Sequence, residues 1–153
     1  SFQQMLRKGL SPNSVTFLCV VKACGSIRAF EKGNQIHARI LREGLLERNM
    51  LIGTALIDMY ARCGTLSKSQ QVFDQLYIRD IASWNALIAG YTQNGLSDKA
   101  LDCFQQMQYN HLPLSPLTFA SALSASFRYL WLLLNLSTII DEIIYQLLCF
   151  SPC

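Results

Sequence analysis

The tetrapeptide Phe-Gln-Gln-Met occurs at residues 2–5 and again, unchanged, at residues 104–107. A second echo lies inside this period of 102 residues, because Ala-Leu-Ile occurs at residues 55–57 and returns 31 positions later at residues 86–88. Self-similarity over a few tens of residues is the signature of a solenoid, in which each repeat packs against its neighbours. A solenoid presents an extended surface, so the pattern favours binding over chemistry.

The spacing of apolar residues predicts two helices in each repeat. From residue 82 to about residue 93 they recur at helical spacing, and Asn94-Gly95 then interrupts the pattern. Ser97 is a good N-cap for a second helix. The preceding unit repeats this plan, with a stop at Cys63-Gly64 and a cap at Ser67. Each unit is therefore expected to be a helix-turn-helix hairpin, and the chain an all-α solenoid of stacked hairpins.

The same pattern predicts the packing and the unit boundaries. In the earliest complete unit, Gly25-Ser26 predicts the end of the first helix. Four aromatic residues recur at the 31-residue offset and should pack between helices: Tyr60, Phe73, Tyr91 and Phe104. The complete units are 14–49, 50–80 and 81–115, flanked by the end of a partial repeat (1–13), the start of a further long repeat (116–126) and a divergent or degraded tail (127–153) in which the 102-residue register is lost.

Composition excludes several classes of function. The net charge of +3 permits nucleic acid as a partner without demanding it. The six cysteines form no C-x-x-C pair and only two histidines are present, so no zinc site can be assembled, and no other cofactor is indicated. The H-x-E and P-C-x-x-C motifs of a cytidine deaminase are missing, so we expect no enzyme. The longest apolar run, residues 129–140, is too short to cross a bilayer, so we expect no membrane partner.

Three segments resemble pentatricopeptide repeats: Gly-Thr-Ala-Leu-Ile-Asp-Met-Tyr-Ala-Arg-Cys-Gly at 53–64, Ser-Trp-Asn-Ala-Leu-Ile-Ala-Gly-Tyr at 83–91, and the long variant Gly-Asn-Gln-Ile-His-Ala at 33–38. Unit lengths of 36, 31 and 35 residues resemble the long, short and standard repeats of a plant subclass. Tetratricopeptide repeats keep a constant length of about 34 residues and would not give this cycle.

The resemblance, which covers residues 1 to about 126, implies a right-handed superhelix that binds single-stranded RNA in plant mitochondria or chloroplasts. It further implies a specificity factor for cytidine-to-uridine RNA editing or for RNA processing, with proteins of the editing complex as further partners. The alternative is a helical-repeat scaffold for protein–protein interaction, similar to tetratricopeptide repeats.

In this family each repeat meets one base, which is read by a few side chains. The resemblance assigns Thr54 and Asp80 to one base, which implies guanine, because an ionised carboxylate accepts from guanine's N–H donors. It assigns Asn85 and Ser115 to the next base, which implies cytosine, with uracil second. Threonine near a helix start and aspartate before one are also ordinary capping residues, so a purely local role is the alternative. Secondary contacts are expected from residues that end a repeat or pack against bases: Asn13, Asn49, Leu51 and Ala82.

Overall fold

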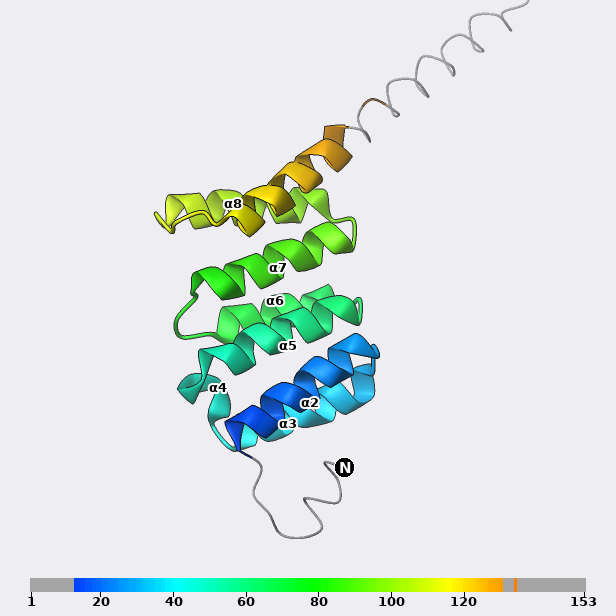
Figure 1. Cartoon of the computed structure of the whole chain (residues 1–153), viewed down its shortest axis with the longest axis vertical. Coiled ribbons are helices and arrows are strands. Elements are labelled where there is room, and N and C mark those ends of the chain that lie inside the picture. The colour runs from blue at the N-terminus through cyan, green and yellow to red at the C-terminus, as the bar shows by residue number, and fades with distance from the viewer. Residues whose placement is uncertain (1–12, 131–133, 135–153) are drawn as a thin grey trace, which may run out of the picture.

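The structure, a computed structural model, describes residues 13–130 and 134 (Figure 1). Most of the partial repeat (1–13) and most of the tail (127–153) therefore lie outside the described residues. The described part is helical and contains no strand. Its helices are α2 (Ser14–Ser26), α3 (Phe30–Arg42), α4 (Leu45–Arg48), α5 (Met50–Arg62), α6 (Leu66–Gln75), α7 (Ile81–Gln93) and α8 (Ser97–Tyr109), followed by a helix over residues 116–130.

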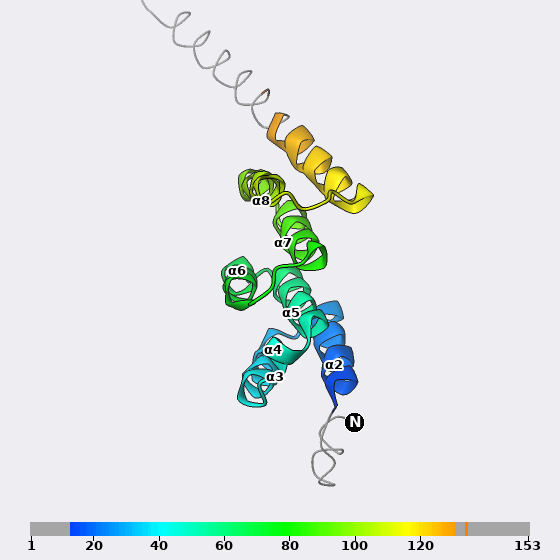
Figure 2. The ribbon, with the colours of Figure 1, turned by 90° about the vertical axis from the view of Figure 1, so that its left-hand side faces the viewer.

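The helices pair into hairpins that stack in two layers. α2 packs on α3, α5 on α6 and α7 on α8. α2, α5 and α7, which we call the first helices, also pack on one another in sequence and form one layer with the helix 116–130. α3, α6 and α8, the second helices, form the other layer (Figure 2). The predicted α-solenoid of stacked hairpins is confirmed.

The lengths of the second helices and their connections differ between units. α2, α5 and α7 begin at Ser14, Met50 and Ile81, the residues that open the three expected units, and the next helix begins at residue 116. The first unit contains the additional turn α4, whereas α6 in the second unit has 10 residues against 13 in α3 and α8. The division into repeats stays a prediction.

Two glycines make the turns of the second and third hairpins. Gly64 and Gly95 adopt φ values of 76° and 80°, a left-handed conformation that glycine reaches without strain. The following N–H closes each helix end by donating to a carbonyl five residues earlier, from Thr65 to Tyr60 (3.0 Å) and from Leu96 to Tyr91 (2.9 Å). The predicted stops at Cys63-Gly64 and Asn94-Gly95 are confirmed.

The predicted caps at Ser67 and Ser97 are wrong. The second helices begin earlier, with Thr65 and Leu96 at their N-cap positions and no side-chain capping bond at either. The reason is the tight turn. The residue after each glycine closes the end of the first helix with its N–H and is also the N-cap of the second helix. Ser97 is instead the first residue of α8, and its buried hydroxyl has no hydrogen-bond partner in the described part of the chain.

The first hairpin turns without a glycine in the left-handed position. α2 ends at Ser26, as predicted, but the left-handed residue is Arg28, with φ 52°. Gly25 is helical and buried, and a Cβ built on it would lie 3.2 Å from the Cα of Met59. This glycine therefore permits the close approach of α2 to α5 rather than the turn.

Three of the four recurring aromatic residues lie in the core as predicted. Tyr60, Phe73 and Tyr91 are at most 3% exposed. Phe104 is only half-buried: it packs against the edge of the core, with its ring centroid 6.3 Å from that of Phe119. The seam between the layers is completed by apolar residues of the first helices, among them Phe17, Val21, Ile52, Leu56, Ile57, Leu87 and Ile88.

Gly90 sets the spacing between α5 and α7, so Gly90→Ala should destabilise the fold. An added Cβ would lie 2.7 Å from the Cβ of Ala61, and both atoms are fixed to helical backbones. Overpacking should cost about 1–3 kcal/mol, which outweighs the gain in helix propensity from alanine. The free energy of unfolding, measured in urea, should therefore fall by about 1–2 kcal/mol. Gly33→Ala is the matched control, because its Cβ meets the flexible end of Met59. An equal loss in both variants would contradict this account.

His37 should make stability depend on pH. Burial, and secondarily the charge of Lys68, lower the pKa of His37 below its ordinary 6.5. Its Nδ1 lies 2.9 Å from the Tyr60 hydroxyl, whereas Nε2 is buried without a hydrogen-bond partner among the described residues, so protonation there is unfavourable. Near pH 6.5 the unfolded chain therefore binds more protons than the folded one, and stability should fall as the pH drops from 7.5 to 5.5.

The control is His37→Gln, which removes this titration and leaves the exposed His111 in place. Urea unfolding across the same pH range should show a flatter dependence of the unfolding free energy for the variant. Identical slopes in the two proteins would show that His37 does not carry the effect.

Candidate functional site

The residues predicted to end each repeat all cap the first helix of the next one. In each case a side-chain oxygen accepts from a backbone N–H in the first turn of the helix that follows. The pairs are Asn13 with Thr16 (2.9 Å), Asn49 with Leu51 (3.0 Å), Asp80 with Ser83 (2.8 Å) and Ser115 with Thr118 (3.2 Å). The local capping role is therefore present, and it fixes all four side chains at the same end of the first-helix layer.

Thr54 and Asp80 are half-buried and are not bonded to each other. The Thr54 hydroxyl donates to the carbonyl of Met50, one turn earlier in α5 (3.2 Å). Oδ1 of Asp80 is occupied by the N–H of Ser83, and the described residues supply no donor to Oδ2. This carboxylate keeps acceptor capacity for an external N–H donor.

Asn85 and Ser115, 30 residues apart in sequence, are in direct contact. Nδ2 of Asn85 donates to the Ser115 hydroxyl at 3.1 Å. A third side chain, Thr118, joins them: its hydroxyl donates to Oδ1 of Asn85 and lies 2.8 Å from the Ser115 hydroxyl. The sequence interpretation found the first two residues and missed Thr118, although the spacing Ser-x-x-Thr, with a side chain three residues after a cap, could have indicated it.

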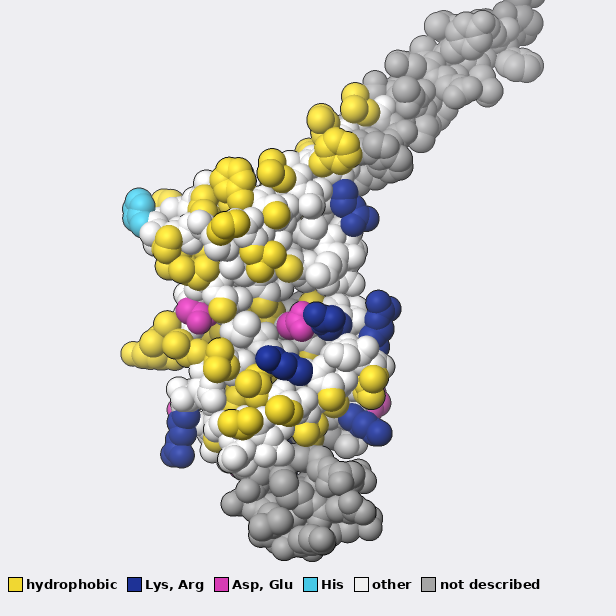
Figure 3. All heavy atoms as spheres, viewed as in Figure 1, with side chains coloured by type: hydrophobic (Ala, Val, Ile, Leu, Met, Phe, Trp, Pro, Cys, Tyr) yellow, Lys and Arg dark blue, Asp and Glu magenta, His cyan; other side chains and the backbone are white. Residues whose placement is uncertain are grey.

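Exposed apolar side chains lie beside these polar residues. Leu51 is 61% exposed, and Ala82 is exposed at the same place in α7, the second residue of the helix. Val15 and Leu117, 65% and 61% exposed, occupy that place in the flanking first helices. The face lined by the first helices accordingly mixes apolar patches with a few charges (Figure 3). Such a row of apolar and polar groups suits flat rings that stack and also present a polar edge.

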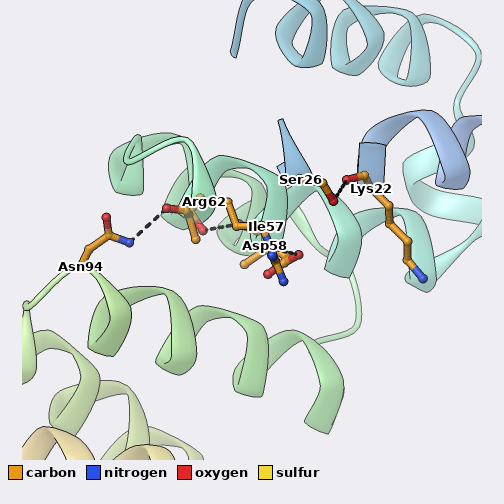
Figure 4. Close-up of polar contacts among 8 residues, drawn as sticks. Lys22, Ser26, Ile57, Asp58, Arg62 and Asn94 are labelled. Carbon is orange, nitrogen blue, oxygen red and sulfur yellow. Dashed lines mark hydrogen bonds and ion pairs between the residues drawn. The ribbon is translucent and has the colours of Figure 1, made fainter. Parts of the chain in front are cut away.

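The opposite end of the same layer carries arginines. A cleft of about 320 Å³ lies where α2, α5 and α7 end, and Arg28 and Arg62 contribute to its lining. Nε of Arg62 pairs with Asp58 one turn earlier at 2.8 Å. Nδ2 of Asn94 donates to the carbonyl of Ala61 at 3.0 Å and so ties α7 to α5 (Figure 4). Arg28 and Arg62 therefore lie at one end of the first helices, and the capping residues lie at the other.

The described residues do not bring together a metal site. No group of three or more His, Cys, Asp or Glu side chains among them could hold a metal ion. Within the same residues, no helix is both long enough and apolar enough to cross a membrane.

Comparison with known proteins gives a consistent family. Residues 54–80 and 82–112 match the PPR repeat. The chain is 44% identical over 127 residues to the pentatricopeptide repeat-containing protein CRR2, chloroplastic, of Arabidopsis thaliana. The matched region covers 82% of this chain and 19% of that protein. It is 37% identical over 124 residues to a mitochondrial pentatricopeptide repeat-containing protein of the same plant, covering 81% and 22%.

Solved structures share the fold. The pentatricopeptide repeat protein PPR10, in complex with an 18-nucleotide psaJ RNA element, superposes with a TM-score of 0.72 at 22% identity, over 81% of this chain and 19% of that one. PPR10 from maize gives the same TM-score over 95% of this chain. The chain spans about a fifth of the length of these relatives.

Proposed function

This chain belongs to the pentatricopeptide repeat proteins, and we propose that it binds single-stranded RNA, one base per repeat, in a plant chloroplast or mitochondrion. The observation that carries the proposal is the contact between Asn85 and Ser115, which brings the two expected readers of one base together on the first-helix face. Thr54 and Asp80 occupy the corresponding places one repeat earlier. The bound structure of PPR10 and the names of the relatives agree with this partner and these compartments.

The face offers each part of a nucleotide a suitable group. Polar side chains at the N-terminal end of the first helices would meet base edges, and Leu51 and Ala82 would pack against the rings. Arg28 and Arg62, at the other end, would face the phosphates, whose neutralisation supplies much of the affinity for nucleic acid. In this arrangement the repeats specify bases and the arginines hold the strand.

The role we propose is that of a specificity segment in a factor for cytidine-to-uridine editing or another RNA-processing step. The additional turn α4 in the first unit and the shorter α6 in the second support the subclass with long and short repeats. The chemistry would then belong to other domains or to proteins of the editing complex.

The test is binding to RNAs that differ only at two adjacent positions, measured for a longer array that contains this segment. Thr54 and Asp80 should prefer guanine, and Asn85 and Ser115 should prefer cytosine, then uracil, at the next position towards the 3′ end. The logarithm of the binding constant should fall linearly with the logarithm of the salt concentration. Equal binding of all sixteen combinations would overturn sequence-specific recognition, and retention of a peptide ligand in place of RNA would favour the scaffold alternative.

A further inference from the structure

Thr118 links the two expected base-reading residues of the third unit, although it lies outside the pair that the family pattern supplies. It is fully buried in the first turn of the helix 116–130. Its hydroxyl oxygen contacts Asn85 Oδ1, the Ser115 hydroxyl (2.8 Å) and the Ser115 backbone N–H (3.2 Å). A buried side chain with three polar contacts has little freedom to turn.

The hydrogen bonds among these three side chains determine which donors and acceptors remain free for a base. The single hydroxyl hydrogen of Thr118 goes to Oδ1 of Asn85, so the Ser115 hydroxyl must donate to Thr118 across their 2.8 Å contact. The Ser115 oxygen in turn accepts from Nδ2 of Asn85 and from the N–H of Thr118. The Ser115 hydroxyl is then fully used. Asn85 keeps one free N–H and one free lone pair on its amide.

The orientation of that amide matters for the choice of base. Cytosine presents a donor (N4–H) next to an acceptor (N3), and uracil presents an acceptor (O4) next to a donor (N3–H). An amide with one free donor and one free acceptor therefore suits one pyrimidine in one orientation and the other pyrimidine when it is flipped. The ring of contacts through Ser115 and Thr118 holds one orientation at a time.

We propose that Thr118 is a positioning residue that sets the order of cytosine and uracil in this repeat by fixing the Asn85 amide. The proposal rests on the RNA-binding function proposed above. It predicts that Asn85 alone meets the base edge, while Ser115 and Thr118 act through it. The preceding repeat lacks this device, because the Ser83 hydroxyl donates to the backbone carbonyl of Asp80 and Thr54 bonds within its own helix.

The experiment is an NMR titration of the 153-residue chain and its variants with short RNAs that differ at one base. Thr118→Val keeps the shape of the side chain and the bond from the backbone N–H at 118 to Ser115, but it removes the hydroxyl. The ratio of cytosine to uracil affinity should fall about tenfold, toward unity. Discrimination against purines should change less, since it depends on size. Thr118→Ser should restore the wild-type ratio, which a purely structural role for the threonine methyl would not permit.

Two further measurements separate the possible outcomes. In the free protein, the side-chain amide protons of Asn85 should exchange with solvent faster in Thr118→Val than in the wild type. If Thr118→Val does not fold, the same measurement is made on a second variant, Thr118→Ala. Ser83→Ala, the matched control, should leave the guanine preference of the second unit unchanged. An unaltered amide, or an unaltered cytosine-to-uracil ratio in a folded variant, overturns the inference alone. A wild-type chain without any base preference overturns the proposed function, and the inference with it.

Discussion

Replacing Tyr60 with alanine should lower the free energy of unfolding by about 3–5 kcal/mol, the usual cost of deleting a large buried aromatic side chain. Tyr60 is fully buried in α5, and its ring lies against Phe30, His37 and Lys68 of the neighbouring helices. A domain of this size is stabilised by roughly 5–15 kcal/mol, so the variant would lose a large share of its stability.

The hydroxyl of Tyr60 adds a polar link between repeats. It donates to Oδ1 of Asn34 at 3.2 Å, and Nζ of Lys68 donates to the same oxygen at 2.6 Å. Burial raises the pKa of Tyr60 to about 12, so the phenol stays protonated and able to donate across the working pH range. Tyr60→Phe removes this link together with the contact of the hydroxyl with Nδ1 of His37, and it should cost less than Tyr60→Ala, about 1–3 kcal/mol.

Urea unfolding followed by circular dichroism would measure both losses. Tyr109→Ala is the matched control, because Tyr109 is 85% exposed and its truncation should change stability by less than about 0.5 kcal/mol. A Tyr60→Ala protein as stable as the Tyr109→Ala protein would contradict the burial of this ring between repeats.

The sequence was sufficient for the features that repeat. The 31-residue echo located three buried aromatic residues, Tyr60, Phe73 and Tyr91. Gly64 and Gly95 marked the turns of the second and third hairpins, because a left-handed residue is needed there and glycine adopts that conformation readily. It was insufficient where one residue type serves two purposes. Gly25 resembles a turn glycine but provides room for Met59, while Arg28 takes the left-handed conformation. Ser67 and Ser97 resemble caps, but the tight turns place the caps elsewhere.

The candidate site was predictable only in part for a related reason. The family pattern indicated Asn85 and Ser115, and the fold places them in contact because consecutive first helices lie side by side. Thr118 was missed because its role depends on two partners in the preceding unit that lie 30 residues apart, which no single motif encodes. The spacing of a cap and a hydroxyl three residues later does recur, as Asn13 with Thr16, Asp80 with Ser83 and Ser115 with Thr118. The contact with Asn85 is the part that only the fold reveals.

Replacing Asp80 with asparagine should weaken binding of RNA that carries guanine opposite the second unit. Guanine presents two adjacent N–H donors, and the carboxylate accepts from them without offering a hydrogen of its own. Asparagine offers one acceptor and one donor, so one guanine N–H would lose its charged acceptor. The expected loss is about 1–3 kcal/mol, or roughly 5- to 150-fold in affinity. Adenine, with a donor at N6 beside an acceptor at N1, should gain relative to guanine.

This substitution separates recognition from folding. Asp80 caps α7 through its bond to the N–H of Ser83, and asparagine is an equally good cap, so the unfolding free energy should be nearly unchanged. Asp74→Asn is the control for charge. Asp74 is exposed on α6 in the second-helix layer, so this substitution removes the same charge at a place away from the first-helix face.

Affinities would be measured for four RNAs that differ only at the position opposite the second unit. If Asp80→Asn lowered affinity equally for all four bases, the residue would hold the strand and not read it. If the four affinities did not change, Thr54 and Asp80 would have been assigned to one base in the wrong register. Because the cap and the fold are preserved in either case, a loss confined to guanine can come only from the face that the carboxylate presents to the base.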